Sequence, residues 1–316
     1  MNSSEKHTSN TAPGSETPWV GTTLIALSAA GFASLTLLGK VAIELNLSLL
    51  TVLGLRFLGA ALILGIGLGI TRHQLILPGR KLTLTFFLLG AIGYAGQSAL
   101  FFAGLSRNPA SISSLLLYAY PIFVAILERM LFHRRLSSPQ LWALFLSLFG
   151  ILLIFGNFQL GAVANSTSVD IVGAFLVLGS ALWYAGYIVT SNRYINHASP
   201  WVSTMWISLG AGFSFAIIGL VTGTWKFPIE VKSYLLILAM ILISTIMALG
   251  TFLAGLQRVG PTTASLLSTL EPVFTIILAV ILLGESLSGG QLFGGVLILA
   301  AVLLLTIPGK LRRNET

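Results

Sequence analysis

The sequence predicts an all-α integral membrane protein with ten transmembrane helices in two inverted five-helix repeats. Composition is the first reason: 55% of the residues are hydrophobic, 8% are charged, and the mean hydropathy is +0.94. About a quarter of the residues of a soluble domain are charged, so most of this chain must face lipid. The other two reasons are an internal repeat and the distribution of basic residues between the loops.

The internal repeat joins two apolar stretches at a constant offset of 151 residues. Residues 103–107, Ala-Gly-Leu-Ser-Arg, recur at 254–258 as Ala-Gly-Leu-Gln-Arg, and the match continues without a gap past Pro121 and Pro272. The first spans of the two halves agree more weakly, at an offset of 152. An internal repeat in a membrane protein indicates a transporter built from two related halves with its substrate between them.

Ten apolar runs approach the length of about 20 helical residues that a bilayer core requires. The first, fourth, fifth, seventh and ninth begin at or directly after a proline, where a helix loses nothing by the missing N–H. Because five is an odd number of crossings, the second repeat enters the membrane from the opposite side. In order, the predicted spans are 19–43, 49–70, 82–105, 110–132, 139–156, 171–193, 200–221, 233–257, 261–283 and 288–307.

Basic residues predict the orientation of these spans. If the N-terminus is inside, 12 of the 17 Lys and Arg residues fall in inner loops and tails, four fall in outer loops, and Arg56 lies within the second span. Cytoplasmic loops carry the excess of Lys and Arg, so both termini are predicted to be cytoplasmic, at the plasma (inner) membrane. The predicted domains are a disordered tail over 1–18, the repeats over 19–156 and 171–307, and a basic tail over 308–316.

Pro121 and Pro272 stand inside the fourth and ninth spans rather than at their starts. A proline within a helix frees the backbone carbonyl one turn back and kinks the helix. In a membrane such a carbonyl needs a partner or a cavity. The sequence therefore predicts a kink and a polar environment at matching depths of the two halves.

The second half contains Gly-Pro-Thr-Thr-Ala-Ser-Leu-Leu-Ser-Thr-Leu-Glu-Pro-Val-Phe over 260–274, then Leu-Gly-Glu over 283–285 and Gln-Leu-Phe-Gly-Gly over 291–295. With Leu-Arg-Phe over 55–57, these strings resemble the EamA-type members of the drug/metabolite transporter superfamily. The resemblance covers nearly the whole chain. The first half departs from it, with Tyr120 where the second has Glu271, and His-Arg at 133–134 where the second has Gly-Glu.

The resemblance implies a ten-helix bundle that works by alternating access and exports amino acids or other small metabolites. Some members of the superfamily carry sugar phosphates or nucleotide sugars instead. The resemblance also implies that spans 1, 3 and 4, with their repeat mates 6, 8 and 9, surround the pathway. Spans 5 and 10 then brace each half or form a homodimer contact.

Two charged side chains within the predicted spans are candidates for function. A carboxylate in mid-membrane is costly and normally faces a partner or a wet cavity, so Glu271 is predicted either to bind substrate and couple transport to protons or to support the chain beside Pro272. Arg56 can bind an anionic substrate group through its fork of donors. Alternatively, it is an internal counter-ion to Glu271 or Glu44.

Polar and aromatic residues at helical spacing predict the walls of a cavity, as in the third and sixth spans. Faces with Gln, Tyr, Ser and Thr are expected to point inward, although small residues at such spacing also serve helix packing. The predicted substrate-binding residues are Tyr94, Gln97, Tyr118, Trp183, Tyr184, Tyr187, Ser268 and Glu271.

Together these patterns predict a secondary active transporter of small organic metabolites, with export of amino acids or related compounds placed first. A sugar-phosphate or nucleotide-sugar exchanger is an alternative that needs several cavity cations, of which the sequence offers Arg56 and Lys40. A membrane channel is the alternative from another class. The sequence has no cysteine, phosphate loop, nucleophile elbow or zinc motif, so no enzyme, cofactor, metal or nucleic-acid partner is expected. The expected partners are a metabolite and the lipid bilayer.

Overall fold

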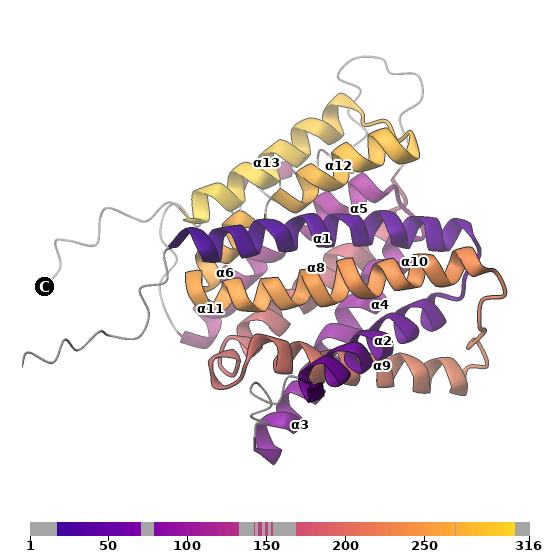
Figure 1. The fold of residues 1–316 in the computed structure, drawn as a ribbon. Helices are drawn as coiled ribbons and strands as arrows, with labels where there is room; N and C mark the ends of the chain where they lie inside the picture. Colours follow the sequence, from indigo (N-terminus) through magenta and orange to yellow (C-terminus); the bar gives the residue numbers. More distant parts are fainter. Residues whose placement is uncertain are drawn as a thin grey trace, which may run out of the picture.

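The structure is a computed structural model that describes residues 18–70, 79–132, 169–268 and 270–306. It also describes the helical positions 142, 145–146, 149–150 and 153 of the predicted fifth span. Within this part of the chain every regular element is helical, and the helices form one bundle (Figure 1). The two predicted tails, apart from Pro18, and most of the fifth span lie outside the described residues.

The helices of the first half follow the predicted spans closely. The third span is continuous but contains a π-helical turn, and the fourth is interrupted at Tyr118 and Ala119. The elements are α1 (Pro18–Glu44), α2 (Leu49–Ile70), α3 (Arg80–Leu88), η1 (Leu89–Tyr94), α4 (Ala95–Leu105), α5 (Ala110–Leu117) and α6 (Tyr120–Phe132).

The second half repeats this pattern with one difference. The predicted boundary between the eighth and ninth spans lies inside the continuous helix α11 (Ala248–Leu267). Pro261 removes one backbone hydrogen bond there, but the helix continues past it. The elements are α8 (Ile171–Ser191), η2 (Ile195–His197), α9 (Pro200–Val221), α10 (Val231–Ile241), η3 (Leu242–Met247), α11 (Ala248–Leu267), α12 (Leu270–Leu283) and α13 (Gly289–Thr306).

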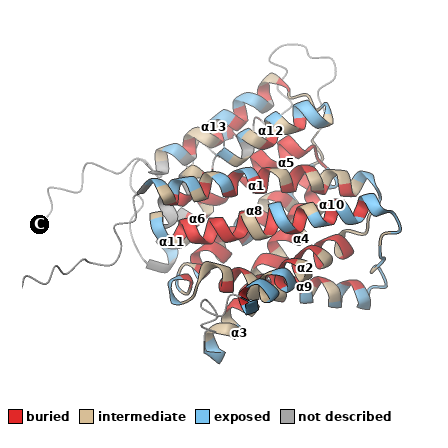
Figure 2. Ribbon diagram, viewed as in Figure 1, coloured by how far each residue is buried: buried red, intermediate tan, exposed pale blue. Residues whose placement is uncertain are grey.

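Six helices of the described chain are long and apolar enough to cross a membrane, and three shorter apolar helices accompany them. The outward side chains are apolar, as Ile70 at 77% and Val221 at 81% exposure show, whereas Arg56 and Gln97 are buried. Buried residues concentrate on α1, α4, α5 and α8 in the middle of the bundle (Figure 2). Apolar residues outside and polar residues inside are the arrangement expected of a protein surrounded by lipid.

The internal repeat appears in the structure as the same helix crossing made twice. Gly21 of α1 lies against Val259 of α11, and its repeat mate Gly173 of α8 lies against Asn108, which follows α4. Each crossing joins a helix of one half to a helix of the other, α1 to α11 and α4 to α8. The π-helical turns η1 and η3 also occupy corresponding places in the third and eighth predicted spans.

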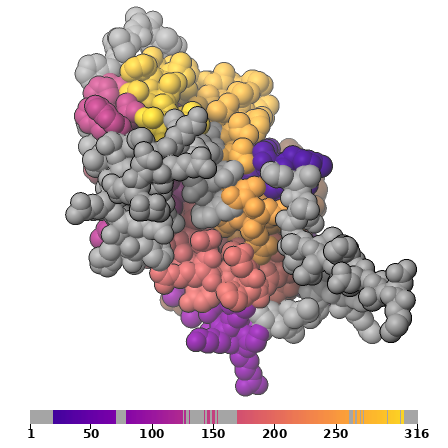
Figure 3. Space-filling model, turned by 90° about the vertical axis from the view of Figure 1, so that its left-hand side faces the viewer, coloured from indigo at the N-terminus to yellow at the C-terminus, as the bar shows by residue number. Residues whose placement is uncertain are grey.

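The start of α1 and the end of α13 lie at the same end of the bundle (Figure 1). Figure 3 views the molecule from this side and shows segments of both halves of the sequence, including the start of α3 and the residues around η2. This placement agrees with two termini on one side of a membrane.

The opposite end of the bundle is fastened by hydrogen bonds between the halves. The carboxylate of Glu285, in the loop after α12, accepts from the backbone N–H of Ala110 at 2.7 Å and of Ser111 at 3.0 Å, and from the Ser111 hydroxyl at 2.6 Å. Asn108 and the backbone of Asp170 exchange two further hydrogen bonds. Glu285 thereby caps the N-terminus of α5, where free N–H groups and the helix dipole favour an anion.

We predict that Gly90→Ala destabilises the protein, because α3–α4 and α9 touch backbone to backbone at this point. A Cβ on Gly90 would fall on the carbonyl of Ile207, and a Cβ on Gly210 would fall on the carbonyl of Phe87. Overpacking of this kind costs about 1–3 kcal/mol. The melting temperature in detergent should fall by several degrees for Gly90→Ala but not for the control Gly186→Ala, whose Cβ has nothing within 4 Å. Equal melting temperatures would show that the two helices can separate without cost.

Candidate functional site

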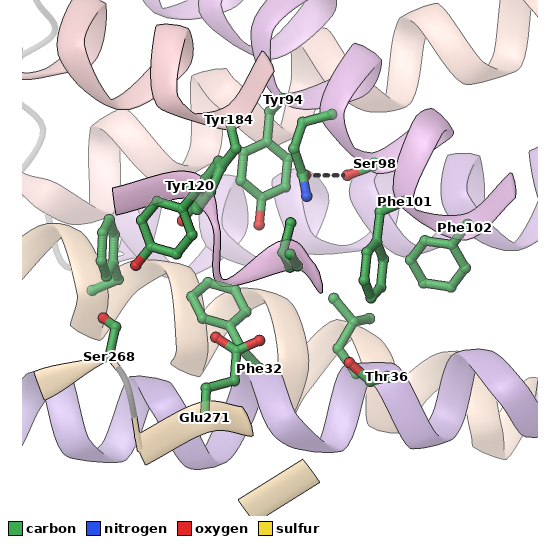
Figure 4. A pocket seen from close by; sticks show the side chains of 14 residues that line it. Phe32, Thr36, Tyr94, Ser98, Phe101, Phe102, Tyr120, Tyr184, Ser268 and Glu271 are labelled. Atoms are coloured by element: carbon green, nitrogen blue, oxygen red, sulfur yellow. Dashed lines mark hydrogen bonds between the residues drawn. The ribbon is translucent and has the colours of Figure 1, made fainter. Parts of the chain in front are cut away.

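A narrow cavity lies in the middle of the bundle, between helices of both halves (Figure 4). Its volume, as available to the centre of a water molecule, is about 40 Å³, which is room for roughly three waters. A metabolite of amino-acid size therefore requires the walls to move apart. The lining residues are Phe32, Leu35, Thr36, Tyr94, Gln97, Ser98, Phe101, Phe102, Leu117, Tyr120, Tyr184, Phe252, Ser268 and Glu271.

Glu271 is the acidic residue of this lining and sits in the first turn of α12. Its backbone N–H donates to the carbonyl of Ser268 at 2.9 Å, which starts the new helix after α11 ends. The hydroxyl of Tyr118 donates to the Glu271 carboxylate at 3.0 Å and also contacts the backbone carbonyl of Ser268. Since a hydroxyl carries one proton, Tyr118 can donate to one of these two acceptors at a time.

The predicted kinks at Pro121 and Pro272 are instead complete helix breaks. Pro121 is the second residue of α6 and Pro272 is the third of α12. Proline is well tolerated in the first turn of a helix because those N–H groups have no partner within the helix. The prediction of a kinked, continuous helix was therefore wrong. The predicted polar environment is present at both breaks.

A chain of aromatic rings connects the fourth and sixth predicted spans to the third. The ring of Tyr118 lies 5.5 Å from that of Tyr120, Tyr120 lies 5.0 Å from Tyr184, and Tyr184 stacks on Tyr187 at 5.9 Å. Tyr187 then packs edge-on against Tyr94 at 5.3 Å between centroids. In Figure 4, Tyr94, Tyr120 and Glu271 point into the same space. Large apolar faces with hydroxyl groups suit a small amphipathic ligand.

The structure brings most of the predicted substrate-binding residues together. Tyr94, Gln97, Tyr184, Ser268 and Glu271 line the cavity.

The other three predicted residues lie behind the cavity or away from it. Tyr118 and Tyr187 are buried beside the lining and touch it through Glu271 and Tyr184. Trp183 lies apart: its side chain is 45% exposed and its indole N–H donates to the carbonyl of Ile92 at 3.1 Å. This hydrogen bond anchors α8 on η1, so a substrate contact for Trp183 stays a prediction.

Arg56 does not form the predicted ion pair. It is fully buried, and in the described part of the chain it pairs with neither Glu271 nor Glu44. Its Nε and both Nη atoms have no hydrogen-bond partner there. The guanidinium instead lies 4.0 Å from the centroid of Phe57 and 5.9 Å from that of Phe102.

Several lining residues were missed, although the repeat contained the signal that finds them. Tyr120 is the repeat mate of Glu271, and the mates of Ser268 and Phe252 are Leu117 and Phe101. At the offset of 152 that relates the first spans, Phe32 is likewise the mate of Tyr184. Both members of each pair line the cavity, so the cavity lies at the interface between the two halves. Applying the offsets to the predicted residues Glu271, Ser268 and Tyr184 identifies Tyr120, Leu117 and Phe32.

A family model for EamA-like transporters matches residues 19–156 and again residues 171–307. The chain belongs to the EamA-like transporter family. It is therefore a multi-pass integral membrane protein of the drug/metabolite transporter superfamily and a transporter rather than an enzyme.

This EamA protein is similar to several bacterial transporters. It is 29% identical to a probable amino-acid metabolite efflux pump of Salmonella typhimurium, over 76% of this chain and 79% of the relative. It is 28% identical to the threonine/homoserine exporter RhtA of the same species, over 70% of each chain. The uncharacterized transporter YyaM of Bacillus subtilis is 26% identical, over 77% of this chain and 78% of its own.

A known crystal structure shares the fold of the EamA protein. It matches with a TM-score of 0.60 and 20% identity, over 92% of this chain and 96% of the other. At this identity the likeness concerns the fold alone.

We predict that Tyr118→Phe destabilises the EamA protein, because it removes the hydroxyl that donates to the Glu271 carboxylate and contacts the Ser268 carbonyl. A buried polar group without a partner costs about 1–3 kcal/mol. Thermal unfolding in detergent should show the loss, and Tyr234→Phe, which makes the same change on a side chain that is 46% exposed, should not. Equal stability of both variants would mean that water replaces the hydroxyl.

Proposed function

We propose that this EamA protein is a secondary active exporter of amino acids or closely related small metabolites. The observation that carries the proposal is the polar and aromatic cavity between the two halves, with Glu271 in its wall. The names of the amino-acid metabolite efflux pump and of the threonine/homoserine exporter support this substrate class.

The proposed architecture is ten spans in two inverted five-helix repeats, over residues 19–156 and 171–307, that give access to the cavity alternately from each side. The paired crossings of α1 with α11 and of α4 with α8 support it, and so do the repeat mates in the lining. In such a design the substrate site lies at the interface of the repeats near the bilayer midplane. The predicted homodimer contact through the fifth and tenth spans belongs to the same proposal.

The lining also favours amino acids over the alternative substrates. A sugar phosphate or nucleotide sugar carries two or more negative charges, which require several cations at the site. The residues that line the cavity in the described chain include no Lys or Arg. The small volume of the cavity likewise favours a carrier over an open channel.

Glu271 is the proposed proton-coupling group. Ionised, it accepts a hydrogen bond from the Tyr118 hydroxyl. Protonated, it becomes a donor to the Tyr118 oxygen, and the Tyr118 hydroxyl is then free to donate to the Ser268 carbonyl. Proton binding thus alters the contact between the two helix breaks, one from each half. The repeat mate of Glu271 is Tyr120, so one half alone offers a carboxylate at this position.

We predict that Glu271→Gln separates exchange from proton-driven transport. Glutamine keeps the size and the hydrogen bonding of the side chain but has no proton to exchange near neutral pH. In proteoliposomes, threonine should still exchange across the membrane at a rate within about twofold of wild type, whereas an imposed pH gradient should no longer drive its accumulation.

The matched control for this experiment is Glu230→Gln, an exposed position at the start of α10. It should behave as wild type in both assays. Accumulation that is still driven by a pH gradient in Glu271→Gln vesicles would exclude Glu271 as the coupling group.

The proposed location is the plasma (inner) membrane with both termini in the cytoplasm. Twelve basic residues on the predicted inner side support this orientation. A reporter that is active in the cytoplasm alone should be active when fused after Thr316 and inactive when inserted near Val163, in the predicted outer loop. The reverse pattern would overturn the orientation.

A further inference from the structure

We propose that Arg56 is the carboxylate-binding group of the transport site, so that substrates are metabolites with a free carboxylate. This inference rests on the proposed function and adds the group that selects the substrate.

Arg56 is a buried cation whose hydrogen-bond donors have no partner in the described chain. Its side chain is completely buried, and Nε, Nη1 and Nη2 have no hydrogen-bond partner in the described chain. A guanidinium carries five N–H donors, and a buried charge without a partner is strongly destabilising. The ring of Phe57, 4.0 Å away, attracts the positive charge but accepts none of these hydrogen bonds in the plane of the guanidinium. An anion with planar acceptors, such as a carboxylate, would satisfy these donors.

Arg56 lies directly behind the cavity wall. Phe102 lines the cavity and its ring centroid lies 5.9 Å from the guanidinium. On the other side, Phe57 packs edge-on against Tyr94, which also lines the cavity, at 5.5 Å between centroids. One aromatic layer thus separates the cation from the cavity. The cavity must widen to admit a metabolite, and a movement of Phe102 both widens it and exposes the guanidinium.

The aromatic rings beside the cavity link Arg56 to the surroundings of Glu271. The ring chain from Tyr118 through Tyr184 and Tyr187 to Tyr94 connects the surroundings of Glu271 to those of Arg56. A free amino acid has a carboxylate that matches Arg56 and an ammonium group that suits the faces and hydroxyls of the tyrosine rings in the cavity wall. The nearby cation Lys40 is committed elsewhere, since its Nζ donates to the carbonyls of Leu105 and Asn108. Among the described residues, Arg56 is thus a cation beside the cavity whose donors remain available.

The test measures binding of matched compounds to purified protein by thermal shift and calorimetry. The probes are the standard amino acids, the amide of each, and the corresponding 2-hydroxy acid, which keeps the carboxylate and lacks the amine. The variants are Arg56→Lys, which keeps the charge but loses the planar fork, and Arg56→Met, which removes the charge. Arg80→Met, at the exposed start of α3, is the control. Size-exclusion chromatography confirms that each protein is folded.

Wild type and Arg80→Met should bind the preferred amino acid at least 30-fold more tightly than its amide. Arg56→Met should lose this preference and Arg56→Lys should weaken it by about tenfold or more. A preference that stays unchanged in both Arg56 variants would overturn the inference while leaving amino-acid export intact. Binding of 2-hydroxy acids but not of amino acids, lost in the Arg56 variants, would support the carboxylate site and overturn amino-acid export. Binding of no carboxylate by the wild type would overturn both.

Discussion

A helix that breaks in the middle of a membrane leaves backbone groups that lipid cannot satisfy, and the central site of this protein depends on how they are satisfied. The fourth predicted span breaks between α5 and α6, and the ninth breaks before α12. Tyr118, at the first break, places its hydroxyl on the Ser268 carbonyl at the second. Glu271 accepts from the same hydroxyl, so a titratable carboxylate lies beside the exposed backbone. The polar end of the cavity is therefore a consequence of breaking two helices at one depth.

The repeat explains why these breaks meet. Both halves contribute repeat mates to the cavity, among them Tyr120 with Glu271 and Leu117 with Ser268. The halves are also interlocked, since α1 packs on α11 and α4 on α8. A displacement of one half relative to the other must then alter both ends of the site together, which is the geometric requirement of a carrier. The exchange of a carboxylate for a tyrosine within one repeat pair makes the site chemically one-sided.

The sequence alone predicted the helical class, most helix boundaries and five of the 14 lining residues, namely Tyr94, Gln97, Tyr184, Ser268 and Glu271. Hydrophobic length locates α2 and α9 to the residue, because apolar runs in lipid end where polar residues begin. It did not predict the breaks at Tyr118 and before α12, since a proline in an apolar run fits a kink and a first turn equally well. Nor did it predict the surroundings of Arg56. One-dimensional patterns identify a buried charge but not the ring of Phe102 that faces it, because this contact joins α2 to α4 across the bundle.

The hydrogen bonds of Glu285 to the start of α5, at the end of the bundle opposite the termini, involve a position at which the two halves differ in charge. Glu285 caps the free N-terminus of α5, and its repeat mate is Arg134, a cation that the positive end of a helix would repel. The repeat mate of α5 also has no free N-terminus to cap, because α11 continues through it to Leu267. Position 134 therefore does not repeat the carboxylate that makes this contact. The Glu285 hydrogen bonds hold the two halves together at this end, and the exchange of Glu for Arg within the repeat makes the two ends of the bundle chemically different.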